Sequence, residues 1–407
     1  MKQNKTTQYD VIIIGGGMVG ASLACALSNQ NNKRIAVVEA HEFNSNVQPS
    51  FDDRSIALNY GSRRIWEAMN LWHELEPLIE PIKTIHISDK GHLGAARLYH
   101  EEEGVEALGY VAENRIVGKV LMNKIKQLQH IDWYCPATIE QLEQSENSVN
   151  IIIDEAGSKK ELSSLLLVAA DGALSKTRSL SGLNIRQQNY DQVAVIANVE
   201  TEYAHNNVAY ERFTDSGPLA FLPMTEQRCS VVWTVNAADQ DKVMSFNDEQ
   251  FIEKLQQRFG FRLGHILKTG ERYAYPLSYV ETEQLVKKRL VVIGNAAHAL
   301  HPVSGQGYNL ALRDVAELAE LIADHDDPGH ELLLAEYAAK RRKDMQRVYR
   351  ITDTLVKVFS NSFAPLGHAR AAGLIAMDLI SSIRHLMARQ SMGLLGQMNK
   401  MMRRISL

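Results

Sequence analysis

Residues 294–307 read GNAAHALHPVSGQG, and this stretch is the strongest single indication of the fold class. It follows the apolar run Leu290–Ile293 and precedes a helical pattern that starts near Asn309. A strand, a loop of small residues and a helix N-terminus together present backbone N–H groups and a positive dipole end to one point. This arrangement suits an anionic ligand.

A second glycine-rich loop lies near the N-terminus. Gly15, Gly17 and Gly20 follow the apolar run Val11–Ile14 and open a helical pattern. Such glycines allow a tight turn, close approach of a pyrophosphate, and close packing of helix on strand, while an acid such as Glu39 accepts hydrogen bonds from a ribose. The alternative is a turn that merely needs glycine. Two such loops, nearly a chain length apart, predict a dinucleotide with a second, redox-active head.

Short apolar runs elsewhere indicate a parallel sheet covered by helices, because they lack polar alternation and are followed by glycines or acids. We expect ligands at the carboxyl ends of these strands. Because the runs are scattered, the nucleotide-binding domain is expected to be discontinuous. The runs are Val11–Ile14, Ile35–Val38, Leu165–Val168 and Leu290–Ile293.

The middle of the chain has a different pattern. Four segments alternate apolar and polar residues, which predicts an antiparallel sheet with one covered face and one face toward solvent or ligand. A helix capped by Asn247 and ended by Gly260 follows them. The alternating segments are Gln192–Val199, Val208–Phe213, Leu219–Met224 and Ser230–Val235.

These patterns predict an α/β protein with a discontinuous Rossmann-like domain, an inserted antiparallel substrate domain and a C-terminal helical segment. The expected nucleotide-binding parts are 1–80, 101–185 and 285–360, the expected substrate-domain parts are 81–100 and 186–284, and the tail is 361–407.

Composition excludes several classes of protein. The net charge of −4 argues against nucleic-acid binding. Cys25, Cys135 and Cys229 are isolated, which disfavours a disulfide framework or a zinc site and is typical of a reducing compartment. We find no signal-peptide pattern and no run near the roughly 18 apolar residues of a membrane span. A cytoplasmic protein, soluble or peripheral to the inner membrane, is expected.

The tail is basic and rich in methionine, with Asp378 as its single acid between 363 and 407. A tail of this kind can lie on an anionic membrane or dock on a partner. The alternative is a helix pair packed on the core with its arginines in water.

Several other residues are candidates for chemistry. Arg54 can clamp a phosphate or a ring edge, or it can pair with Asp52 or Asp53. His298 and His301, beside Pro302, are candidate bases, although histidines on loops more often satisfy local hydrogen bonds. The N–H groups around Gly305, Gln306 and Gly307 suit a developing negative charge on a bound ring. Asp171-Gly172 is either a ligand contact or an ordinary turn.

Read together, the Gly15–Gly20 loop with Glu39, the segment around Arg54, residues 170–178 and residues 294–314 resemble FAD-dependent aromatic hydroxylases built like para-hydroxybenzoate hydroxylase. Within that superfamily the chain is similar to the ubiquinone-biosynthesis branch. Three further segments, 88–94, 194–199 and 211–224, resemble hydroxylases of 2-polyprenyl-6-methoxyphenol.

The resemblance implies a role for each loop. Gly15, Gly17, Gly20 and Glu39 would hold the ADP half of FAD, and Arg54 would lie near the flavin. Asp171-Gly172 would contact FAD and NADPH, while Gly305, Gln306 and Gly307 would lie against the isoalloxazine. The chain departs from the superfamily at Asn295, where Asp is usual; Asn keeps an acceptor oxygen but loses the charge.

The resemblance also implies the reaction. NADPH or NADH would reduce FAD, the reduced flavin would add O2 at C4a, and the peroxide would hydroxylate a polyprenylated phenol to the 1,4-benzoquinol. The alternatives are hydroxylation at another ring position, an NAD-dependent dehydrogenase, and a flavin-bound assembly subunit of a ubiquinone-biosynthesis complex. The visible spectrum of the purified protein separates the dehydrogenase from the flavoproteins.

Overall fold

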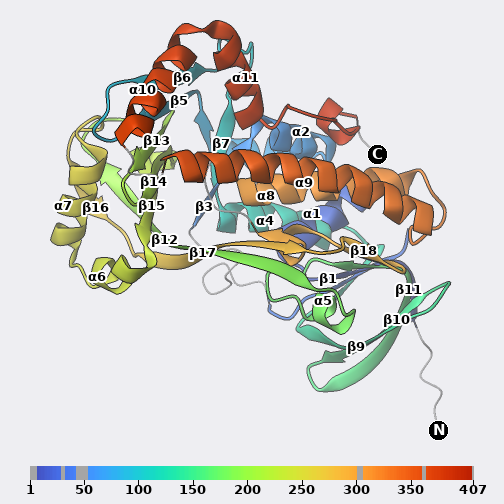
Figure 1. Ribbon diagram of the computed structural model, residues 1–407. Coiled ribbons are helices and arrows are strands. Elements are labelled where there is room, and N and C mark those ends of the chain that lie inside the picture. Colours follow the sequence, from blue (N-terminus) through green and yellow to red (C-terminus); the bar gives the residue numbers. More distant parts are fainter. Residues whose placement is uncertain (1–6, 29–32, 43–53, 300–305, 360–363, 406–407) are drawn as a thin grey trace.

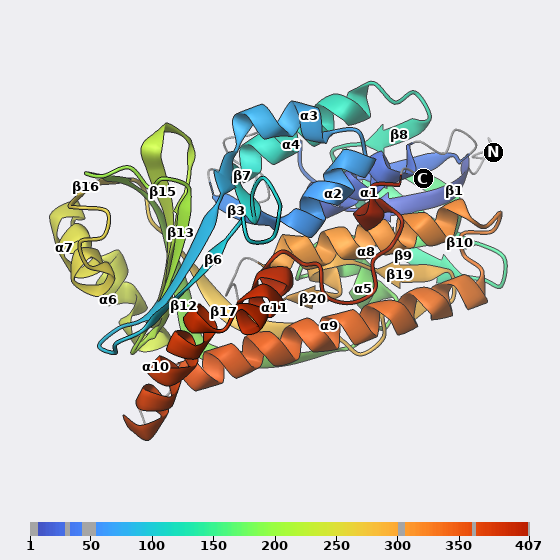
Figure 2. The ribbon, with the colours of Figure 1, turned by 90° about the horizontal axis from the view of Figure 1, so that it is seen from above.

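The computed structural model describes residues 7–28, 33–42, 54–299, 306–359 and 364–405. Two large sheets lie side by side, each with helices on it, and the long helix α9 (Glu331–Phe359) runs past both of them (Figure 1, Figure 2). The mixed α/β architecture predicted from the sequence is confirmed.

The first sheet is built from the apolar runs. Its parallel strands stand in the order β19, β11, β1, β2, β8, and each of the four runs supplies one of the first four. Antiparallel β18 extends the β19 edge, and the β9–β10 hairpin pairs with β11. The bounds are β1 Thr7–Ile14, β2 Ile35–Val38, β8 Ile131–Tyr134, β9 Ala137–Gln144, β10 Val149–Glu155, β11 Ser158–Ala169, β18 Val286–Lys287 and β19 Leu290–Val292.

Helices bury the first sheet because their apolar stripes pack on its strands and on one another. Helix α1 packs against α4 and α8, and α8 packs against α9. Helix α8 begins at Gln306, three residues before the start predicted near Asn309. One of its faces is buried, and this face carries Leu312, Val315, Ala316, Ala319 and Ile322. The bounds are α1 Met18–Leu27, α2 Tyr60–Ala68, α3 Trp72–Leu75, α4 Asn114–Lys126, α5 Lys176–Leu180, α8 Gln306–Ala323 and α9 Glu331–Phe359.

The second sheet has the order β20, β17, β12, β15, β14, β13, β5, β6, with β16 beside β12. All pairs are antiparallel except β13–β5. Its strands come from both predicted substrate-domain segments, and β20 joins from the chain near residue 298. The bounds are β5 Thr84–Asp89, β6 Ala95–Tyr99, β12 Ile185–Thr201, β13 Val208–Thr214, β14 Gly217–Pro223, β15 Arg228–Asn236, β16 Ile266–Thr269, β17 Tyr273–Thr282 and β20 His298–Ala299.

Helices α6 (Gln240–Met244) and α7 (Asp248–Phe259) cover one face of the second sheet, where Phe221, Trp233 and Phe251 form its core. The predicted cap of α7 is confirmed: Asn247 and Gln250 form a reciprocal capping box, and Gly260 ends the helix at φ +88°. The opposite face of the sheet carries half-buried residues and is the one that faces the site.

A small third sheet, β3 (Ser55–Asn59), β7 (Gly109–Glu113) and β4 (Glu80–Ile82), joins the two large ones. Its Ile82 and Val111 pack with Ala209 and Met224 of the second sheet. The tail forms α10 (Ala364–Leu379) and α11 (Ser381–Ser391), followed by a 3-10 turn, Met401–Arg403.

One of the two alternatives for the tail, a helix pair packed on the core with its arginines in water, differs from the structure at two arginines. Arg370 pairs with Asp89 at 2.9 Å, and Arg384 pairs with Glu102 at 2.6 Å, because acids of the body lie directly beneath these helices. Met392, Met401 and Met402 are buried in the body.

Candidate functional site

The first glycine loop connects β1 to α1, and the neighbouring backbone lies so close to it that there is no room for side chains at Gly15 and Gly20. Gly15 has φ +100°, and a Cβ there would lie 2.5 Å from the Ala170 carbonyl oxygen. A Cβ on Gly20 would lie 1.8 Å from the Gly15 carbonyl oxygen. Gly17 is the N-cap residue of α1. Only glycine therefore permits this turn, which leaves backbone N–H groups at the start of α1 accessible to a phosphate.

Glu39 follows β2 directly and is buried beside this loop. Its Oε2 accepts a hydrogen bond from the Gly16 N–H at 2.6 Å, and its Oε1 accepts one from the His41 N–H at 2.9 Å. The carboxylate thus lies at the glycine loop, as the dinucleotide pattern predicts.

The second loop begins at Gly294, which has φ +59° and lies against α1. A Cβ on Gly294 would come within 3.0 Å of the Val19 side chain. Further along the chain, the Tyr308 hydroxyl hydrogen-bonds to Ser22 Oγ at 2.8 Å. The two loops, distant in sequence, therefore meet at one end of the parallel sheet. Asn295 is exposed at this junction.

A buried network of charges supports the second loop. Asp314 of α8 accepts hydrogen bonds from the Gly294 N–H at 3.0 Å, from His298 Nε2 at 2.7 Å, and from Arg341 Nε at 2.7 Å. Burial favours a raised pKa for Asp314, but His298 and Arg341 outweigh it, and the pKa is lowered. The carboxylate stays ionised and fastens the loop to α8 and α9.

His298 is one of the predicted bases, and its ring is buried and turned to Asp314. We interpret it as a support of the loop; its role in proton transfer stays a prediction. His301, Pro302 and Gly305 lie outside the described residues.

The N-terminus of α8 points to the same junction. Gln306 is its first residue, and a Cβ on Gly307 would meet no atom of the described residues within 4 Å. There is thus open space beside the first turn of an 18-residue helix, where unpaired N–H groups and the dipole favour a negatively charged ring.

Asp171-Gly172 follows β11, and the Asp171 side chain binds the first turn of α5, whose N-cap residue is Ser175. Asp171 accepts hydrogen bonds from Ser175 Oγ at 2.5 Å, the Thr177 N–H at 3.0 Å and Thr177 Oγ1 at 2.9 Å. Gly172 has φ +82°, and in the described part of the chain no atom lies within 4 Å of where its Cβ would be. The carboxylate shapes α5, while the glycine leaves room for a ligand at the strand end.

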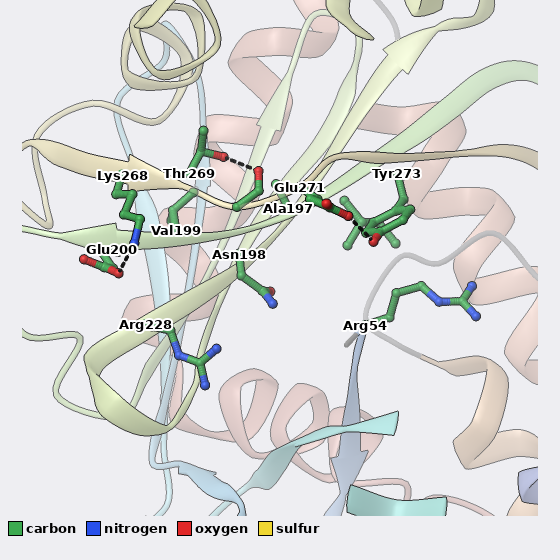
Figure 3. Close-up of a pocket in the computed structure, with 12 residues that line it drawn as sticks. Arg54, Ala197, Asn198, Val199, Glu200, Arg228, Lys268, Thr269, Glu271 and Tyr273 are labelled. Atoms are coloured by element: carbon green, nitrogen blue, oxygen red, sulfur yellow. Dashed lines mark hydrogen bonds and ion pairs between the residues drawn. The ribbon is translucent and has the colours of Figure 1, made fainter. Parts of the chain in front are cut away.

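Arg54 lies at the entry to β3 and reaches across to the second sheet. Its guanidinium lies 4.7 Å from the ring centre of Tyr275 in a cation–π contact. Arg54 lines a pocket of about 240 Å³ between the second and third sheets, together with Asn198, Arg228 and Tyr273. Figure 3 shows Arg54, Asn198 and Arg228 entering this space from different elements. Its predicted alternative partners, Asp52 and Asp53, lie outside the described residues.

The sequence patterns did not identify the pocket residues contributed by the second sheet. Arg228 at the start of β15 pairs with the buried Glu113 at 2.9 Å and so ties this sheet to the third one. Half-buried Ile196, Val232 and Ala220 form one row across β12, β15 and β14 on the pocket side. The alternation of Tyr273-Ala274-Tyr275 was the available signal, but only strand register shows which side chains face the pocket.

These residues fit FAD. The first loop and Glu39 suit the ADP half, and open space at Gly307 and Gly172 leaves room for the flavin half. The Ser55 hydroxyl beside Arg54 is buried and has no hydrogen-bond partner within the described part of the chain. An unpaired buried hydroxyl at this junction is explained by a ligand that bonds to it.

Comparisons with known proteins agree with this geometry. Residues 8–352 match the family model described as FAD binding domain. The chain is 35% identical to ubiquinone hydroxylase UbiL of Rhodospirillum rubrum over 390 residues, covering 95% of this chain and 90% of that protein. It is 26% identical over 434 residues to the mitochondrial ubiquinone biosynthesis monooxygenase COQ6 of Homo sapiens, covering 93% and 91% of the two chains.

Among solved structures, p-nitrophenol 4-monooxygenase PnpA from Pseudomonas putida DLL-E4 matches with a TM-score of 0.80 at 18% identity, over 97% of this chain and 100% of that one. At this identity the likeness concerns the fold alone. Since the family model spans most of the chain, and the glycine loops, Glu39 and the α8 N-terminus fit its cofactor, the chain belongs to the FAD binding domain family and is an FAD-dependent aromatic-ring monooxygenase.

Proposed function

We propose that this enzyme hydroxylates 2-polyprenyl-6-methoxyphenol to the corresponding 1,4-benzoquinol in ubiquinone biosynthesis. The relatives named as ubiquinone hydroxylase or ubiquinone biosynthesis monooxygenase support the pathway. The observation that carries the proposal is a half-buried apolar row on the second sheet, in which Ile196 pairs with Val232 and Val232 with Ala220, and whose Ile196 lines the same pocket as Arg54. A substituted phenol ring suits such a surface better than a charged substrate does.

FAD, when bound, would supply the redox chemistry: it would take two electrons from NADPH or NADH and allow one oxygen atom of O2 to be transferred to the phenol ring. The protein's own groups stabilise charge and shield the reaction from water. The N-terminus of α8 stabilises negative charge, and the third sheet and the apolar row exclude water. Arg54, held over Tyr275, places a fixed cation at the edge of the pocket.

The test is aerobic NADPH oxidation by the FAD-loaded protein with a short-chain 2-prenyl-6-methoxyphenol. We expect stimulated oxidation and a product that carries one oxygen atom from labelled O2 para to the phenol hydroxyl. The control substrate is 2-methoxyphenol, which lacks the prenyl group and should stimulate less.

The position of the new oxygen decides between related activities. If the new oxygen is found at another ring carbon, the enzyme hydroxylates a different position in the same pathway and the proposed activity is wrong. Oxidation without stimulation by any prenylated phenol would contradict both.

A further inference from the structure

Helices α10 and α11 have an unusual distribution of side chains for a surface helix pair. Between 369 and 389, all of which the structure describes, the exposed positions hold alanine, glycine, serine, five large aliphatic residues and Arg389. A surface helix normally turns its apolar side inward and its charged side to water. The five aliphatic residues are Ile375, Leu379, Ile380, Ile383 and Leu386.

The charged residues of the pair are directed toward the protein. In α10, Arg370 Nε lies 2.9 Å from Asp89, and Asp378 accepts a hydrogen bond from the Arg97 N–H at 3.1 Å. In α11, His385 Nδ1 lies 2.6 Å from Glu103. The charged groups therefore fasten the helices to β5, β6 and the loop after β6, which leaves the apolar side exposed.

The two helices meet in an elbow that projects from one end of the molecule (Figure 1, Figure 2). Within the described ranges no single helix has the length and composition of a membrane span, while 369–379 and 381–391 meet that criterion together but are bent by 96°. Leu379, which is 76% exposed, and Ile380 lie at the bend. A bent, projecting apolar ridge suits insertion into a surface layer rather than a crossing.

The loop between β5 and β6 adds to this ridge. Leu93 is 88% exposed at its tip. The next residue, Gly94, lies so close to α10 that a Cβ on it would be 3.0 Å from the Ala371 carbonyl oxygen and 3.1 Å from Ile375. Leu93 therefore projects beside the aliphatic residues of α10. We call Leu93, Ile375, Leu379, Ile380, Ile383 and Leu386 the elbow patch.

From this geometry we propose that the elbow patch docks the enzyme on an anionic lipid bilayer. The exposed charge within 369–389 is positive, because Asp378 is engaged by Arg97 and Arg389 is exposed. Anionic headgroups complement that charge, and the aliphatic side chains enter the boundary with the acyl chains.

The elbow patch is connected to the candidate site by packed apolar residues. Ala388 of α11 and Met392, the C-cap residue of that helix, pack in a cluster that Ile85 joins from β5. Ile85 also packs against the cluster that contains Ala209 and contacts Leu222. Docking here therefore sets the pocket-bearing sheet at the membrane, where, on the proposed function, a polyprenylated substrate resides.

Flotation of the FAD-loaded full chain with vesicles tests the proposal. The vesicles contain phosphatidylethanolamine and phosphatidylglycerol, and a second set contains phosphatidylcholine alone. We expect the wild type to float with the anionic set and less with the neutral set. Leu379→Asp and Leu386→Asp should each lower the bound fraction about tenfold, since each puts a charge into the interface.

Leu332→Asp is the matched control, because Leu332 is 74% exposed but lies at the start of α9, away from the elbow patch. It should float like the wild type. Bound FAD and melting temperature establish that each variant is folded. Equal flotation of Leu379→Asp and wild type, or no flotation of the wild type, would overturn the proposal.

Sedimentation velocity without vesicles tests whether a second copy of the chain, rather than a bilayer, covers the elbow patch. A dimer of the wild type that Leu379→Asp dissolves would assign the patch to a second copy and overturn bilayer docking. Flotation does not require NADPH or substrate, so the docking stands or falls independently of the hydroxylation assay.

Discussion

The two glycine-rich loops reach the same end of the parallel sheet, but different forces hold them. The first is held by contact between backbones, since Gly15 and Gly20 leave no room for a methyl group. The second is held by a buried carboxylate, Asp314, with His298 and Arg341 around it. The first loop depends on the absence of side chains, and the second depends on ionised side chains. Substitutions in the first loop should therefore weaken FAD binding, whereas substitutions in the second should lower the stability of the fold.

The largest effect is expected at the first loop. Gly20→Ala places a Cβ 1.8 Å from a carbonyl oxygen, so the backbone itself must move. We expect FAD binding to weaken roughly a hundredfold, equivalent to about 3 kcal/mol, near the upper end of overpacking costs. Flavin fluorescence titration measures it, and unchanged affinity would show that this close approach of helix and loop is not needed for binding.

At the second loop the expected loss is in stability. Asp314→Asn removes the charge between two buried partners and should lower the free energy of unfolding by about 3 kcal/mol. Denaturant unfolding measures this. Asp215→Asn is the control, because the Asp215 carboxylate is 70% exposed in its pair with Arg258 and its loss should cost about 1 kcal/mol or less. Equal losses would contradict the special role of Asp314.

The same network predicts a pH dependence. Burial favours a raised pKa for Asp344, but Arg341 and Arg313 lower it to about 2. Since the folded pKa is below the unfolded one, the stabilisation is complete above about pH 4 and is lost as the pH falls toward 2. Wild-type stability should fall by about 2 kcal/mol from this residue over that window. Asp344→Asn, less stable at neutral pH, should show a shallower fall; parallel curves would contradict it.

The smallest effect is expected at Gly307, in the first turn of α8 beside the second loop. Gly307→Ala adds a methyl group that meets none of the residues described by the structure and lies in a helix, so the melting temperature without FAD should not drop. If the flavin occupies that space, its affinity should fall about tenfold. Unchanged affinity would place the flavin elsewhere, while a drop in the FAD-free melting temperature would contradict the open geometry.

The sequence predicted helices and strands well where their formation depends on residues that are close together in the chain. The apolar runs became parallel strands, and Asn247 caps α7, because burial on both faces and a helix N-terminus each leave a short-range signature. Helix α8 starts three residues before the position that the sequence predicts, because Gly307 makes Gln306–Tyr308 resemble a continuation of the glycine-rich loop. Histidine roles were left open because a sequence does not show which carboxylate lies across the fold.

By itself, the sequence determined that two glycine-rich turns and a buried parallel sheet would form, because glycine requirements and apolar periodicity act over a few residues. Only the tertiary structure decided that the turns meet, that Asp314 joins His298 to Arg341, and that Arg54 lies over Tyr275. It also decided that the charged side of α10 and α11 faces inward. The physical reason is that ion pairs and ring contacts depend on distances between residues far apart in the chain, which no local pattern encodes.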